Sequence, residues 1–158
     1  MKMGSFGRCA LLMGTLVSFS LASSAVFAAQ GSCYANLTVN VSGFANSQGD
    51  ARIAVFNSAA SYSGGGYGST GAVRKAAVHI SGSTAAVTFK KLPCGTYAVQ
   101  AFHSPDGSGV FRTGAFGRPS QGYGFSNNPN SLMGKPSFNR SAFTLKQNTA
   151  IDISLVGE

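Results

Sequence analysis

Few side chains in this sequence of 158 residues could do acid–base, nucleophilic or metal chemistry. There are two histidines, His79 and His103, three cysteines and four acids. His79 has no second ligand at metal spacing, and no serine lies in the Gly-x-Ser-x-Gly turn of hydrolases. A hydrolase would need a site assembled from His103, Asp106 and Ser126, which we keep as the alternative. The sequence otherwise predicts a protein without catalytic activity, cofactor or metal.

The N-terminal segment has the features of a cleaved secretory leader. Lys2 and Arg8 precede a long apolar run without acids, and small residues predict cleavage after Ala28. Serines and a glycine interrupt this run, which disfavours a stable membrane anchor. We expect residues 1–28 to be removed and residues 29–158 to form one domain in the periplasm or outside the cell.

Two of the three cysteines, Cys33 and Cys94, remain after this cleavage. In an oxidising compartment an isolated pair of cysteines most often forms a disulfide. The pair lacks the close Cys-x-x-Cys spacing of a redox site, and no base stands nearby in sequence to activate a thiol. We therefore predict a structural disulfide between Cys33 and Cys94.

The processed chain is basic, but its charges are dispersed. Loss of Lys2 and Arg8 lowers the net charge from +8 to +6. The remaining cations form only two adjacent pairs, whereas a nucleic-acid interface usually gathers them on one face. The composition predicts no nucleic-acid partner.

Short runs in which apolar and polar residues alternate predict strands rather than helices. The runs lie at residues 37–41, 53–55, 78–80, 85–89, 97–102, 143–145 and 151–155. Turn residues separate them, and no window combines helical spacing with capping residues. Seven short strands predict an all-β, antiparallel sandwich. A stretch rich in Gly, Ser and Tyr, residues 61–71, has no packing pattern and is interpreted as a mobile loop.

One long segment, residues 103–139, interrupts the regular spacing of the strands. A loop of this length in a compact domain is usually either functional or a mis-assigned element. Its large apolar residues should not remain in water, and the glycines between them allow positive φ angles and close approach. We expect an ordered capping loop over one end or face of the sandwich. The apolar residues that this cap would bury are Phe111, Phe116, Tyr123, Phe125, Leu132, Met133 and Phe138.

The strongest motif of the chain is Gly-Tyr-Gly-Phe-Ser-Asn-Asn, residues 122–128. It follows a turn and strand with Leu92, Gly95 and Tyr97, and a loop that begins at His103. This pattern resembles a bacterial family, the domain of unknown function 2141 (DUF2141). The resemblance implies an immunoglobulin-like or prealbumin-like sandwich and no particular activity, since a fold does not itself supply a function.

The loop after His103 departs from the family pattern, which carries oxygen ligands at alternate positions like a calcium loop. The corresponding residues are Ser104, Asp106, Ser108 and Arg112, with one carboxylate and one cation. A hard cation needs about six to eight oxygens and usually several negative charges. We therefore predict a structural turn and no metal site.

The long loop is also the predicted interaction surface. Aromatic faces for stacking, together with amides and a guanidinium for hydrogen bonds, are typical of sites that hold carbohydrate or peptide. We expect an envelope glycan or a protein as the partner. An alternative is that the aromatic rings only lock the cap in place and that the histidine supports it. The candidate binding residues are His103, Arg118, Tyr123, Phe125, Asn127 and Asn128.

Overall fold

The computed structural model describes residues 32–157, so the predicted leader lies outside the described residues. The strands are β1 (Tyr34–Ser42), β2 (Asp50–Phe56), β3 (Arg74–His79), β4 (Thr84–Pro93), β5 (Gly95–Ser104), β6 (Tyr123–Phe125), β7 (Phe143–Leu145) and β8 (Thr149–Ser154). The helical elements are α1 (Ala59–Gly64), the 3-10 turn η1 (Ala115–Gly117) and α2 (Phe138–Ser141). No helix within residues 32–157 has the length and apolar character needed to cross a membrane.

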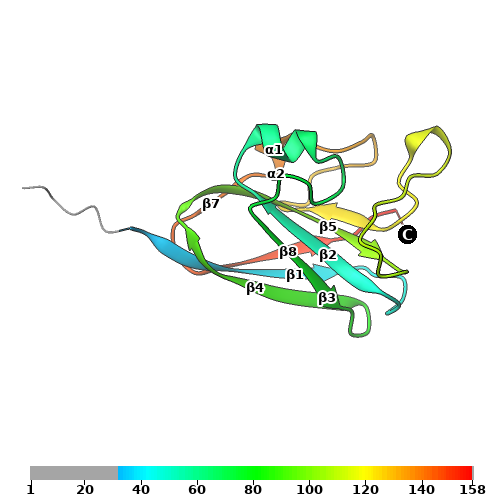
Figure 1. Ribbon diagram of the computed structural model, residues 1–158, viewed down its shortest axis with the longest axis horizontal. Coiled ribbons are helices and arrows are strands. Elements are labelled where there is room, and N and C mark those ends of the chain that lie inside the picture. The colour runs from blue at the N-terminus through cyan, green and yellow to red at the C-terminus, as the bar shows by residue number, and fades with distance from the viewer. Residues whose placement is uncertain (1–31, 158) are drawn as a thin grey trace, which may run out of the picture. The chain divides into compact units, whose positions relative to one another are not determined.

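The strands form two sheets (Figure 1). The smaller sheet has the order β4-β1-β8. The larger sheet has the order β3-β2-β5-β6, with β7 pairing to the start of β5. The pairs are antiparallel except for β1 and β8, which run parallel. A mostly antiparallel, mostly β fold with two sheets is thus confirmed, but the described residues form eight strands rather than the predicted seven.

A hydrophobic core lies between the facing sides of the two sheets. Alternate residues supply it, because successive side chains of a strand point to opposite faces. Val39 and Ile153 come from the smaller sheet, and Val55 and Val99 from the larger one; all four are fully buried. The predicted period-two pattern therefore identified this core.

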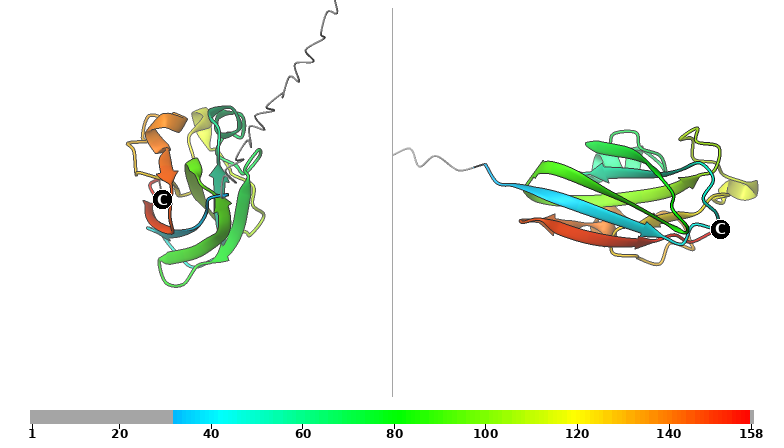
Figure 2. Two further views of the ribbon diagram at one scale, coloured as in Figure 1. Left: turned by 90° about the vertical axis from the view of Figure 1, so that its left-hand side faces the viewer. Right: turned by 90° about the horizontal axis from the view of Figure 1, so that it is seen from below.

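The opposite face of the larger sheet is covered as well. Phe56 of β2 and Phe102 of β5 point away from the core and meet aromatic residues from the segments that follow β2 and β5. Figure 1 shows α1 and α2 on the same side of β2 and β5, and Figure 2 shows the same from two other sides. We call this group the outer aromatic cluster. Its main members are Phe56, Tyr62, Tyr67, Phe102, Phe111, Tyr123, Phe125 and Phe138.

Two elements contradict the sequence predictions. β6 lies inside the segment for which no strand was expected; it has only three residues, all buried, so no polar residue marks its alternation. α1 lies at the start of the stretch interpreted as a mobile loop. Its N-cap Ser58 accepts a hydrogen bond from the Ser61 amide, and Tyr62 is only 1% exposed. Burial of Tyr62 against the larger sheet anchors a stretch whose composition resembles a linker.

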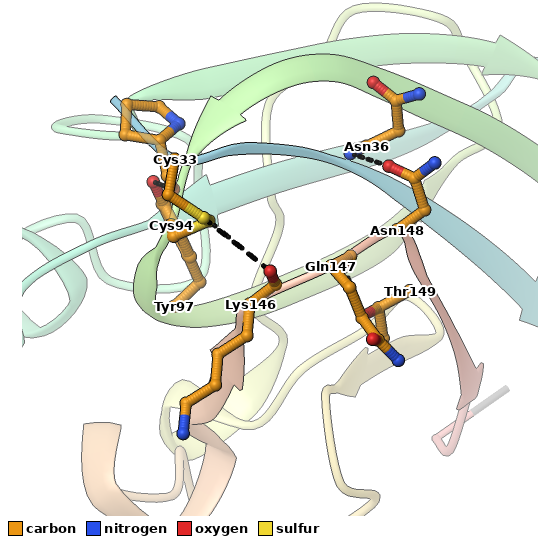
Figure 3. Close-up of a disulfide and its surroundings, with 9 residues drawn as sticks. Cys33, Asn36, Cys94, Tyr97, Lys146, Gln147, Asn148 and Thr149 are labelled. Atoms are coloured by element: carbon orange, nitrogen blue, oxygen red, sulfur yellow. Dashed lines mark hydrogen bonds between the residues drawn. A yellow bond between two sulfur atoms is a disulfide. The ribbon is translucent and has the colours of Figure 1, made fainter. Parts of the chain in front are cut away.

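The predicted disulfide between Cys33 and Cys94 is present, with a Cα–Cα distance of 5.3 Å. It joins the residue before β1 to the turn between β4 and β5. The Cys94 amide also donates to the Cys33 carbonyl at 2.9 Å. Figure 3 shows the Lys146 carbonyl oxygen against the disulfide, 3.6 Å from the Cys94 sulfur. The start of β1, next to Cys33, lies at the end of the domain opposite to η1 (Figure 2).

Candidate functional site

The motif at residues 122–128 lies where the two sheets meet. Its strand β6 pairs with β5 of the larger sheet, from Gln100 to Phe102. Tyr123 also exchanges two backbone hydrogen bonds with Val156, just beyond β8 of the smaller sheet, at 3.0 and 2.9 Å. The motif therefore bonds to both layers. We call residues 122–128 the sheet clasp.

The two rings of the sheet clasp are buried. Tyr123 and Phe125 are 5% and 2% exposed, and both belong to the outer aromatic cluster. The Tyr123 hydroxyl donates to the Ser131 carbonyl at 3.0 Å. These rings offer no free face for stacking on a ligand. Tyr123 and Phe125, predicted as binding residues, instead pack within the outer aromatic cluster.

The small residues of the sheet clasp allow close packing. A Cβ on Gly124 would lie 2.6 Å from Ile153 Cγ2 and 2.8 Å from the Ser154 carbonyl oxygen, so only glycine fits against β8 there. Ser126 is fully buried, and its hydroxyl accepts from the Val99 amide at 2.9 Å and donates to the Ser141 carbonyl. Ser126 thus connects β5 to the end of α2.

The two asparagines of the sheet clasp use their side-chain amides internally. Both have positive φ angles, 65° at Asn127 and 45° at Asn128, which asparagine tolerates better than most residues. Asn127 Nδ2 donates to the Ala142 carbonyl at 2.9 Å. The Asn128 side chain bonds the backbone of β8 twice, donating to the Asp152 carbonyl at 3.0 Å and accepting from the Ser154 amide at 2.8 Å. The Asn128 side chain thus pairs with backbone groups at the edge of β8, as a neighbouring strand would.

His103 is likewise an internal residue. It is 1% exposed at the end of β5, and its Nε2 lies 2.8 Å from the Gln48 carbonyl oxygen. Its ring meets Phe44 edge-on, with the centroids 5.4 Å apart. His103 therefore ties the connection between β1 and β2 to the larger sheet.

The loop after His103 is organised around Asp106. One carboxylate oxygen accepts from the Ser108 amide at 3.1 Å and from the Ser108 hydroxyl at 2.8 Å, and the other meets Arg112. The hydrogen bonds from Ser108, helped by Arg112, lower the pKa of Asp106 to about 2. Within residues 32–157 no three His, Cys, Asp or Glu side chains lie close enough to share a metal ion. The geometry of residues 104–112 is that of a hydrogen-bonded turn.

The structure does not bring together the three residues of the hydrolase alternative. Ser126 bonds to Val99, whereas His103 lies four residues further along β5, roughly 13 Å away at the rise of a strand. The Ser126 hydroxyl and the Asp106 carboxylate both have the internal partners described above. A proton relay among these groups would require the core to rearrange.

Three large apolar side chains of the long loop lie in water. Phe116 and Met133 are 100% exposed and Leu132 is 75% exposed, so the prediction that the cap buries them is wrong. Phe116 lies in η1, which projects from one end of the domain (Figure 1), and the other two lie in the turn before Gly134.

These exposed residues surround one groove with a volume of about 500 Å³. Phe116, Leu132 and Met133 form its apolar walls, and Arg118 is its charged residue. Tyr67 and Tyr123 of the outer aromatic cluster also line it. Among the described residues, 32–157, no acidic residue lines it. Of the six predicted binding residues, the groove contains Arg118 and a part of Tyr123. We call this site the loop groove.

A second hollow, of about 460 Å³, lies where β1 and β8 meet the hairpin of β3 and β4. His79 and Asp152 line it together with Asn40, whose side-chain amide already donates to Asp152 at 2.9 Å. Its walls are otherwise alanine, valine and hydroxyl side chains without an exposed large apolar group. The loop groove has the stronger features of a binding site.

A comparison of the chain with models of known protein families supports the resemblance that the motif indicated. Residues 39–152 match the model of a family described as "Uncharacterized protein conserved in bacteria (DUF2141)", which confirms the resemblance. No curated protein and no solved structure matches the chain.

Proposed function

This chain belongs to the DUF2141 family, and we propose that it is an exported binding module without catalytic activity that holds a protein partner in the loop groove. Export is supported by the leader expected at residues 1–28 and by the disulfide, which is typical of oxidising compartments. We further propose that the fold is an immunoglobulin-like sandwich. Its two facing sheets, which are mostly antiparallel, support this description.

The observation that carries the proposal is the state of Phe116. Its ring is 100% exposed, and its backbone has a φ of 60°, a conformation that bulky residues rarely adopt. A glycine or asparagine would be more favourable in both respects. Exposed aromatic and apolar groups gathered around one groove mark interaction sites, and strained residues cluster there too. In the isolated domain the Phe116 ring packs against nothing, whereas a partner bound in the groove would cover it.

The chemistry of the loop groove favours a protein over a glycan. Sugar recognition would need free amides beside an aromatic face, but the side-chain amides of the sheet clasp donate to backbone carbonyls of the same domain. The groove instead presents Phe116, Leu132 and Met133, and methionine adapts its shape to apolar side chains of a partner. Arg118 adds a donor for a carboxylate or a backbone carbonyl. The expected ligand is an apolar segment with an adjacent acidic or carbonyl group.

Met133→Asp should abolish this binding without unfolding the protein. The substitution places a charge in an apolar contact, and we expect recovery of the partner from envelope extract to fall tenfold or more, about 1.4 kcal/mol or more. The free energy of unfolding should change by about 0.5 kcal/mol or less, because Met133 is fully exposed. The measurement uses a photo-crosslinking residue at position 116, followed by protease and glycosidase treatment of the adduct.

Val110→Asp is the matched control, since Val110 is a 58% exposed apolar residue outside the groove. It should recover the partner as the unmodified chain does. Equal recovery by Met133→Asp would contradict the proposal. An adduct that glycosidase removes and protease does not would replace the protein partner by a glycan.

A further inference from the structure

Lys135 inserts its ammonium group into the side of the outer aromatic cluster. Its Nζ lies 4.0 Å from the centre of the Tyr62 ring and 5.7 Å from that of the Phe56 ring. The same atom donates to the Tyr62 carbonyl at 2.6 Å and to the Gly66 carbonyl. Phe56 ends β2, and the other acceptors lie in and just after α1, about seventy residues before Lys135 in sequence. Two π faces and two carbonyl oxygens thus converge on one nitrogen.

Within residues 32–157, no formal negative charge compensates this ammonium. Among residues 32–157 no carboxylate pairs with Lys135. Burial lowers the pKa of Lys135 to about 8, so the ammonium form still predominates at pH 7. Burial raises the pKa of Tyr62 to about 12, so the phenol stays neutral. The attraction therefore comes from the ring quadrupoles and the carbonyl dipoles, the combination that aromatic cages use for ammonium ligands.

We propose that Phe56, Tyr62 and the carbonyl groups of Tyr62 and Gly66 form a binding site for primary ammonium groups, which Lys135 of the same chain occupies. The site is complete without Lys135, because every acceptor comes from β2, α1 or the turn after α1. Lys135 acts on it as an intramolecular ligand. A lysine side chain or a small amine from elsewhere has the same chemistry and would compete for the cage. This inference does not depend on what occupies the loop groove.

Chemical rescue of Lys135→Ala tests the proposal. The truncation removes a group with the shape of n-propylammonium, so this ion should bind the vacated cage in a saturable way. We expect a dissociation constant in the range of about 1–10 mM, followed by NMR shifts of the Tyr62 ring and the Gly66 amide. Binding should raise the melting temperature of the variant toward that of the unmodified chain.

Three controls separate an ammonium site from an apolar gap. 1-Propanol has the same shape without the charge and should bind at least tenfold more weakly. Tetramethylammonium has the charge but no donor for the two carbonyls, and it should also bind more weakly. Lys135→Met fills the cage and should not respond to n-propylammonium. Equal binding of propanol, or no saturable binding by folded Lys135→Ala, would overturn the proposal.

A measurement on the unmodified chain decides the matter if Lys135→Ala does not fold. A methylene group next to an ammonium 4.0 Å above a ring lies within the shielding region of Tyr62. The ε-methylene protons of Lys135 should therefore resonate upfield of those of the other lysines. Resonance at ordinary positions would contradict occupation of the cage.

Discussion

Phe125→Ala is expected to lower the free energy of unfolding by about 3–5 kcal/mol, the usual cost of removing a buried aromatic ring. The ring is 2% exposed and meets Tyr62, Tyr67 and Tyr123 with centroids 6.3, 6.2 and 5.9 Å away. Truncation leaves a cavity in the outer aromatic cluster at the point where β6 bonds to β5. Urea unfolding followed by circular dichroism measures the loss.

Phe116→Ala is the matched control for this prediction. It is the same chemical change in the same loop, but the ring is 100% exposed, so stability should change by about 0.5 kcal/mol or less. The two variants separate the structural role of the sheet clasp from the binding role of the loop groove. Similar losses of stability in both would mean that Phe116 packs against the domain in solution, and our account of the groove would fail.

Replacement of Cys33 and Cys94 by alanine is expected to cost about 4 kcal/mol. The disulfide closes a loop with a sequence separation of 61 residues, and the chain-entropy model gives this value for a loop of that size. The measurement compares midpoints of unfolding in the absence of reductant. Dithiothreitol should destabilise the unmodified chain and leave the double variant unchanged. A double variant as stable as the unmodified chain would show that the bridge constrains little in the unfolded state.

The regular strands could be predicted because their signal is local. In β1, buried and wetter residues alternate along Leu37, Thr38 and Val39, and the facing core follows from that period. β6 and α1 could not be predicted in the same way. β6 is buried on both faces, and α1 is a short segment of small residues in which one tyrosine provides the anchor. Tertiary contacts, rather than local pattern, determine both elements.

The role of the family motif could not be derived from its residue types. Asn127 and Asn128 have the chemistry of ligand-binding amides, but their partners, Ala142, Asp152 and Ser154, are distant in sequence. Only the fold shows that these amides meet backbone groups. Phe116, Leu132 and Met133 were predicted to be buried, because large apolar residues usually are, but the structure exposes them. A local signal existed at Phe116, which lies between glycines in a turn that holds its ring away from the sheet.

The most direct test of the central claim is amide hydrogen exchange at the junction of the sheet clasp with β8. The Tyr123, Ser154 and Val156 amides donate across it at 3.0, 2.8 and 2.9 Å. If residues 122–128 hold the two sheets together, these amides should exchange only through global unfolding, about a thousandfold or more slowly than the Gly117 amide at the rim of the groove. Exchange as fast as that of Gly117 would mean that the junction opens readily, and the motif would then be free to serve as a binding surface.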